Sequence, residues 1–161
     1  MARDDDESND PEALLETLGE QLDENQLRQF GCVCCRRVAE LCPDPIFLKL
    51  LEFAEARAAG KKKGEPPAKL QSEMDKVYDS LYPGYGSPSP AALALTAVGE
   101  VVFTESALDA ALNASSTAAD AAAVSAAEGV DDDEYDAMSE ETYAVERTWQ
   151  AEQLRKFEER E

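Results

Sequence analysis

Apolar residues recur every three to four positions along most of the chain, and this spacing is typical of amphipathic α-helices. The pattern predicts helices, separated by short polar or proline-rich breaks, over residues 11–22, 23–41, 45–59, 70–81, 90–103, 105–128 and 138–159. Helices joined by such short connections pack antiparallel. We therefore predict an all-α fold over residues 11–161, either a single-domain helical bundle or a short helical-repeat-like stack of about six to seven helices.

Helix boundaries are predicted from capping residues and from residues that break helices. Asp10–Pro11, Asp44–Pro45 and Ser89–Pro90 each place a capping side chain directly before a proline, which is favoured in the first turn of a helix. Gly60 is expected to end the third helix in a left-handed conformation. The segment AALALTAVGEVVF is apolar on nearly every side, so we expect a central helix there, with a strand over EVVFTE as the competing local prediction.

Breaks in the helical pattern define the expected organisation of the chain. Residues 1–10 are predicted to be a disordered acidic arm, because nothing apolar there offsets the entropy of ordering. Glycines and prolines place hinges near 60–66 and 83–90, and consecutive aspartates place an acidic loop near 129–137. The alanine-rich helix before that loop is expected to approach its neighbours closely, because alanine side chains are small.

The charge balance narrows the classes of function. The 161 residues include 35 acids, 15 bases and no histidine, for a net charge of -20. Direct nucleic-acid binding normally requires a basic surface, so it is not expected, whereas a protein partner with a basic face would be attracted. Repulsion between like charges also predicts that added salt stabilises the fold.

Hydropathy and the N-terminal sequence indicate in which cellular compartment the protein is expected. The longest apolar run, Ala91–Phe103, is too short to cross a bilayer and contains Glu100, so no membrane span is expected. The segment MARDDDESNDP lacks the charged-then-apolar pattern of a secretory signal, so we expect a cytoplasmic protein. In that compartment the four cysteines are expected to be free thiols rather than disulfides.

Three of the cysteines gather in FGCVCCRR, residues 30–37. On a helical wheel Cys34 falls in the apolar sector, Cys35 and Cys42 flank it, and Cys32 lies on the other side. We therefore interpret the cluster mainly as core packing, with Cys32 as the one thiol that could be exposed. A redox-responsive thiol and a metal site are the alternatives, although the chain has neither a second Cys-x-x-Cys pair nor a histidine to complete a zinc site.

The lack of histidine also removes common hydrolytic machineries, because Ser-His-Asp and Cys-His catalysis both need a histidine base. The segment GKKKGEPP lacks the features of a phosphate-binding loop, and no dinucleotide-binding fingerprint is present. The sequence therefore predicts no enzyme activity, no catalytic, cofactor-binding or metal-binding residues, and no cofactor.

Arg36, Arg37 and Trp149 are the candidate partner-binding residues. The two arginines lie at the edge of the cysteine-bearing face, where each can form an internal ion pair, with Glu40 or Asp44 as candidate acids, or contact a partner. Trp149 lies in the charged final helix. It can either anchor that helix on the bundle or face a partner, since tryptophan is common both in cores and at the centres of interfaces.

Three segments carry a pattern that is shared with other proteins: DPEALLETL, NQLRQFGCVCCRRVAEL and LLEFAEARAAG. They resemble an uncharacterised family of alanine-rich helical proteins from planctomycete bacteria, which shows a Leu-Arg-x-Phe run followed by Cys-Cys-Arg-Arg. The resemblance is best over residues 10–60, and a late AEQLRKF is similar to the family's closing segment. The family's middle tryptophans and Asn-Pro-Phe tail are absent. The resemblance implies an intracellular all-helical fold and no particular activity.

Together these features predict a non-catalytic, acidic protein–protein interaction or accessory module. Its partner is expected to be another protein with a basic face, and the pattern leaves the oligomeric state open. The alternative is an acidic inhibitor, immunity protein or nucleic-acid mimic that blocks a basic partner.

Overall fold

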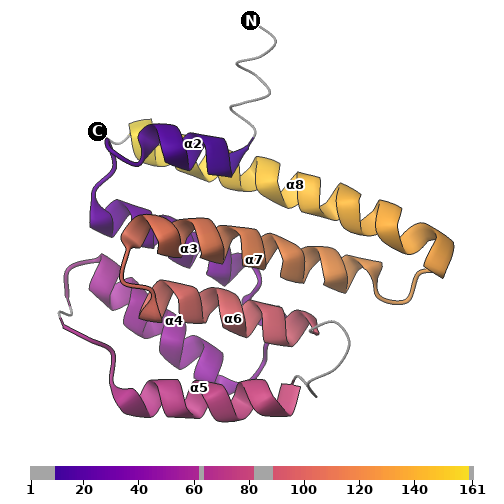
Figure 1. Cartoon of the computed structure of the whole chain (residues 1–161), viewed down its shortest axis with the longest axis horizontal. Coiled ribbons are helices and arrows are strands. Elements are labelled where there is room, and N and C mark those ends of the chain that lie inside the picture. The colour runs from indigo at the N-terminus through magenta and orange to yellow at the C-terminus, as the bar shows by residue number, and fades with distance from the viewer. Residues whose placement is uncertain (1–9, 62–63, 82–88, 160–161) are drawn as a thin grey trace, which may run out of the picture.

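Helices make up most of the computed structural model, which describes residues 10–61, 64–81 and 89–159 (Figure 1). Along the chain the described elements are α2 (Pro11–Leu18), α3 (Glu24–Arg37), the short 3₁₀ helix η1 (Ala39–Leu41), α4 (Pro45–Ala58), α5 (Ala68–Leu81), α6 (Pro90–Phe103), α7 (Ala107–Ala127) and α8 (Asp132–Glu159). The described residues contain no strand, so the strand considered over EVVFTE is wrong. The predicted all-α fold is confirmed.

Side-chain caps start several helices where the sequence places them. Asp10, Asp44 and Ser89 each accept a hydrogen bond from a backbone amide in the first turn of α2, α4 and α6, at 3.0 to 3.1 Å. Asp23 and Gln26 also form a capping box at the start of α3, in which each side chain accepts from the other's backbone amide at 2.8 and 3.0 Å. These bonds satisfy amides that have no partner within the helix.

The helices lie in four tiers, with α2 beside α8, α3 beside α7, α4 beside α6, and α5 outermost (Figure 1). The central helix α7 contacts α2, α3, α6 and α8. Its small side chains allow these close approaches, as predicted, and its buried alanines are Ala107, Ala110, Ala111, Ala114, Ala118, Ala119, Ala121, Ala123 and Ala127. The apolar α6 is central too, because α3, α4, α5 and α7 all pack against it. The arrangement is a single-domain helical bundle.

Gly31 allows α3 to pack closely against α6 and α7. A Cβ atom at this position would lie 3.0 Å from Val101 Cγ2 and 3.8 Å from Ala114 Cβ. A larger residue would therefore push these helices apart. The adjacent core contains Phe30 and Phe47, which are completely buried.

Three predicted boundaries are wrong. The helix predicted over 11–22 ends at Leu18. The helix predicted over 23–41 ends at Arg37, and its last residues form η1. The acidic loop predicted near 129–137 is mostly helical, because α8 begins at Asp132. Acidic side chains in the first turn interact favourably with the positive end of the helix dipole, so the aspartates that suggested a loop support a helix.

Other predicted breaks are partly within the described residues. The break near 60–66 is confirmed, since α4 and α5 are separate helices and both Gly60 and Gly64 have positive φ angles, of 78° and 90°. The hinge near 83–90 lies outside the described residues except for its last two positions. The predicted acidic arm lies outside them except for Asp10, which caps α2.

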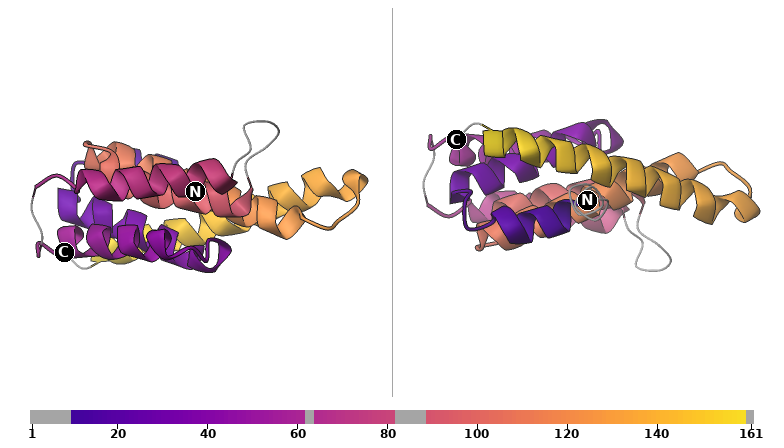
Figure 2. Two further views of the ribbon diagram at one scale, coloured as in Figure 1. Left: turned by 90° about the horizontal axis from the view of Figure 1, so that it is seen from below. Right: turned by 90° about the horizontal axis from the view of Figure 1, so that it is seen from above.

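The hairpin formed by α7 and α8 extends beyond the ends of the other helices (Figure 2). Gly129, with a φ angle of 87°, lies in the turn between the two helices. The exposed acids of this end are Asp120, Glu128, Asp131, Asp132, Asp133, Glu134, Asp136, Glu140 and Glu141. We refer to residues 120–143 as the acidic hairpin. Within the described part of the chain, no helix combines the length and the apolar character that a membrane span requires.

Candidate functional site

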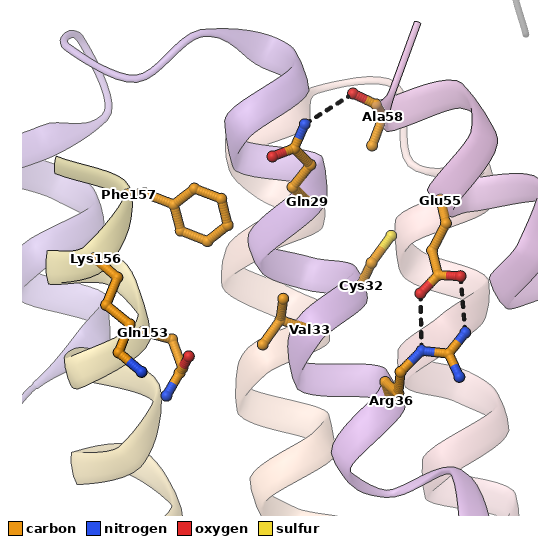
Figure 3. A pocket seen from close by; sticks show the side chains of 9 residues that line it. All are labelled: Gln29, Cys32, Val33, Arg36, Glu55, Ala58, Gln153, Lys156 and Phe157. Atoms are coloured by element: carbon orange, nitrogen blue, oxygen red, sulfur yellow. Dashed lines mark hydrogen bonds and ion pairs between the residues drawn. The ribbon is translucent and has the colours of Figure 1, made fainter. Parts of the chain in front are cut away.

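Arg36 is held at the end of α3 by an ion pair with α4. Its Nε and Nη2 atoms donate to the two carboxylate oxygens of Glu55 at 2.9 and 2.8 Å (Figure 3). These hydrogen bonds raise the pKa of Arg36 above its ordinary value. The expectation of an internal ion pair is confirmed, but the acids predicted for it, Glu40 and Asp44, are wrong.

A groove lies beside this ion pair, between α3, α4 and α8 (Figure 3). Its volume is about 350 Å³. Side chains spaced three or four residues apart on α3 line it, with two residues of α4 and the last turns of α8 forming its sides. Figure 3 shows the Phe157 ring and the Val33 side chain on facing sides of the groove.

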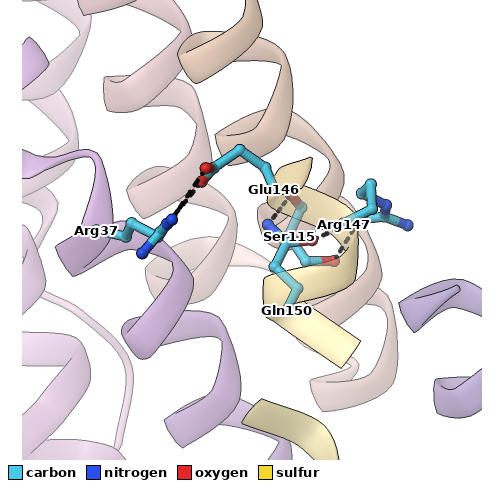
Figure 4. A network of polar contacts seen from close by, with 5 residues as sticks. All are labelled: Arg37, Ser115, Glu146, Arg147 and Gln150. Carbon is cyan, nitrogen blue, oxygen red and sulfur yellow. Dashed lines mark hydrogen bonds and ion pairs between the residues drawn. The ribbon is translucent and has the colours of Figure 1, made fainter. Parts of the chain in front are cut away.

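Arg37 turns towards the last helix instead. Its Nε and Nη2 atoms donate to Glu146 of α8 at 2.7 and 3.1 Å (Figure 4). The guanidinium also lies over the Trp149 ring, with Cζ 4.0 Å from the ring centroid, in a cation–π contact. Arg37 therefore joins α3 to α8, and its acid is again neither Glu40 nor Asp44. Trp149 is half-buried and takes part in this junction, as expected of an anchor.

Behind this junction, a buried polar network joins α7 to α8 (Figure 4). Arg147 Nη1 donates to Ser115 Oγ at 3.2 Å and to Gln150 Oε1 at 3.0 Å. Gln150 Nε2 in turn donates to the Ser115 carbonyl at 2.8 Å. Gln150 is 1 % exposed and Ser115 is completely buried. This network is not predicted from the sequence; the spacing of Arg147 and Gln150 beside Leu154 is the signal that could have revealed it.

A pair of arginines, also not predicted from the sequence, caps the C-terminal end of α6. Arg28 of α3 donates to the carbonyls of Val101, Thr104 and Glu105 at 2.9, 3.2 and 2.7 Å. Arg57 of α4 donates to the Val101 carbonyl at 3.0 Å and to the next carbonyl at 2.8 Å. The Val101 and Val102 carbonyls belong to the last turn of α6, the negative end of its dipole, so the two cations stabilise that end. Burial, followed by repulsion from Arg28, lowers the pKa of Arg57.

All four cysteines are buried free thiols, with exposed fractions of 0 to 3 %. The prediction of core packing is confirmed for Cys34, Cys35 and Cys42. The prediction that Cys32 could be exposed is wrong, because α4 packs beside it (Figure 3). Burial, with a smaller contribution from Glu55, raises the pKa of Cys32 to about 12, so the thiolate needed for reactivity is scarce at neutral pH. No three Cys, Asp or Glu side chains of the described residues converge in a metal-binding arrangement.

The described residues thus define an all-α helical bundle in which both arginines selected from the sequence take part in internal ion pairs. Comparisons with models of protein families, with curated proteins and with solved structures found no match. The resemblance to the planctomycete family therefore stays a prediction.

Proposed function

We propose that the protein is a non-catalytic interaction module that binds another protein through the acidic hairpin. The observation that carries this proposal is the distribution of charge along the chain. No lysine or arginine occurs between Lys76 and Arg147, a stretch that includes α6, α7 and the first half of α8. Every charged side chain within it is acidic. A partner with a basic face is therefore attracted to this part of the molecule.

The acidic hairpin also offers apolar contact area. A hollow of about 510 Å³ between α6, α7 and α8 is lined by the apolar or aromatic side chains Leu93, Val124 and Tyr143 and by Asp120 and Glu140. Neither carboxylate forms an ion pair with another described residue. The combination suits a lysine or arginine of the partner, because its aliphatic stem can pack on apolar surface while its charge meets the carboxylates.

The test is an affinity pull-down from native cytosol at about 50 mM and about 300 mM salt, followed by titration of the purified partner. We expect a partner with a basic face whose affinity falls as salt rises, because exposed charges are screened. The critical variant carries Asp131→Asn, Asp132→Asn, Asp133→Asn and Glu134→Gln. It is expected to lose the partner while circular dichroism shows that the helices remain.

The matched control removes four charges from exposed acids outside the acidic hairpin, by Glu16→Gln, Glu20→Gln, Glu40→Gln and Glu52→Gln. It is expected to keep the partner. Equal losses of partner binding by both variants would show that binding depends only on the net charge, and would contradict binding through the acidic hairpin.

The same purified partner tests the inhibitor alternative, because an inhibitor, immunity protein or nucleic-acid mimic lowers its partner's activity at saturation and an accessory module does not. The proposal that Arg36, Arg37 and Trp149 contact the partner is tested with Arg36→Ala combined with Arg37→Ala, and separately with Trp149→Phe. If these variants bind the partner as the wild type does, the three side chains serve the fold alone.

A further inference from the structure

The groove between α3, α4 and α8 differs in charge from the acidic surface around it. Among its charged lining residues are the two cations Arg36 and Lys156 and the single acid Glu55. Three other pockets of the described residues show no such excess. In the pocket that contains Lys49 and Lys69, acids and bases are equal in number. In the pocket with Asp120 and Glu140 and in the pocket with Arg37, acids outnumber bases. The groove is thus a local excess of positive charge on a chain whose net charge is -20.

Hydrogen-bond donors at the groove are available to a ligand. Arg36 uses Nε and Nη2 on Glu55, and Nη1 has no hydrogen-bond partner among the described residues. Lys156 is exposed and forms no ion pair with a described carboxylate. Figure 3 shows Lys156 and Gln153 on the α8 side of the groove and the Arg36 guanidinium beside Glu55 on the α4 side. Donors on opposite sides suit a ligand whose head group only accepts hydrogen bonds, as a carboxylate does.

The rest of the lining is apolar. Val33, Ala58 and Phe157 contribute hydrocarbon surface. Cys32 stays a neutral thiol, since burial raises its pKa to about 12. The volume of about 350 Å³ is at the small end of the range for small-molecule sites, roughly 300 to 1,000 Å³. An apolar surface of this size accommodates a short hydrocarbon chain or a single aromatic group.

We propose that this groove binds a small carboxylate with an apolar body, its head group between Lys156 and Arg36 and its hydrocarbon against Val33 and Phe157. The site is separate from the acidic hairpin, and of the partner contacts proposed above it includes Arg36. Most anions are repelled by the surface as a whole, so an anion that binds here is selected by the local cations and by the apolar surface together.

The experiment is an amide-resolved NMR titration of the full chain with sodium octanoate, and a parallel titration with octylammonium, which has the same chain length and the opposite charge. Octanoate is expected to give saturable shifts at amides of residues 29–36 and 153–157. Octylammonium is attracted by the net charge but repelled by the local cations, so it is expected to give no saturable shifts at these amides. Saturable octylammonium binding at the same amides, or no saturable octanoate binding, would overturn the proposal.

Two variants locate the head group and the hydrocarbon. Lys156→Gln is exposed and is expected to weaken octanoate binding roughly fivefold, because one charge-assisted contact is lost. The matched control Lys76→Gln removes an exposed lysine of α5 and is expected to leave the affinity unchanged. Val33→Phe is expected to fill the groove and abolish saturation. Equal affinities for the wild type and Lys156→Gln would refute the assigned head-group position even if Val33→Phe failed to fold.

Discussion

Replacing Arg28 by methionine tests whether arginine side chains of α3 and α4 stabilise the C-terminal end of α6. Methionine keeps an unbranched apolar stem, so Arg28→Met removes the guanidinium with little change in packing. The substitution deletes three hydrogen bonds, to the carbonyls of Val101, Thr104 and Glu105. Arg57 still donates to the Val101 carbonyl, so two carbonyls lose the bonds that Arg28 made.

The magnitude follows from these two carbonyls. A hydrogen bond from a charged donor contributes roughly 1.5 to 3 kcal/mol. Water can reach both carbonyls in part, since these two hydrogen bonds are only part-buried, and the loss of repulsion on Arg57 offsets a further fraction. We therefore expect Arg28→Met to lower the free energy of unfolding by about 3 kcal/mol and the Tm by roughly 6 to 12 °C for a domain of this size.

The assay is urea unfolding followed by far-UV circular dichroism, with the free energy obtained by linear extrapolation. Arg36→Met is the matched control, because it removes an arginine whose ion pair is exposed and is worth at most about 1 kcal/mol. If Arg28→Met costs no more than Arg36→Met, water replaces Arg28 without loss and the capping argument is refuted.

Four further outcomes are expected. Raising the salt concentration should raise the Tm in thermal circular dichroism, because screening weakens repulsion within a chain of net charge -20; a constant or falling Tm would contradict this. Gln150→Leu should lower the free energy of unfolding by about 2 kcal/mol in urea titrations, since the buried Ser115 carbonyl and Arg147 each lose a partner, and a neutral effect would show that the network adds no stability. The four thiols should react with a disulfide reagent only after unfolding. Burial raises the pKa of Cys32 to about 12 from an ordinary 9.0, so above about pH 9 the unfolded state binds fewer protons than the folded state. The contribution of Cys32 to the free energy of unfolding is therefore fully present below about pH 9 and decreases above it. A Cys32→Ala variant should show a smaller decrease of the free energy of unfolding with pH.

Local sequence signals predict the helices well because helix formation depends on neighbouring residues. The caps at Asp10, Asp44 and Ser89 act on amides two or three residues away, so their effect is visible in a short window of sequence. The wrong boundary at Asp132 has a local cause too. Consecutive aspartates disfavour a helix interior but stabilise its first turn, and the choice depends on where the helix begins.

Side-chain partners were not predictable in the same way, because they lie far away in sequence. Arg36 pairs with an acid 19 residues away and Arg37 with one 109 residues away, while the predicted acids, Glu40 and Asp44, were chosen for their proximity along the chain. A helical wheel gives the direction of a side chain but not the helix that covers it. This is why the wheel leaves Cys32 as a thiol that could be exposed, although α4 buries it.

The positions of the arginines bear on what the acidic surface can do. Arg28, Arg37, Arg57 and Arg147 each bond to a carbonyl, a carboxylate or a polar side chain of another helix. Their planar guanidinium groups join two or more acceptors at once, which a lysine ammonium in the same place could not reproduce with the same geometry. Much of the positive charge therefore serves contacts between helices, while the acids of the acidic hairpin stay exposed to solvent. Because the two charges are separated in this way, neutralising the acidic hairpin should change partner binding more than stability, and removing Arg28 should do the opposite.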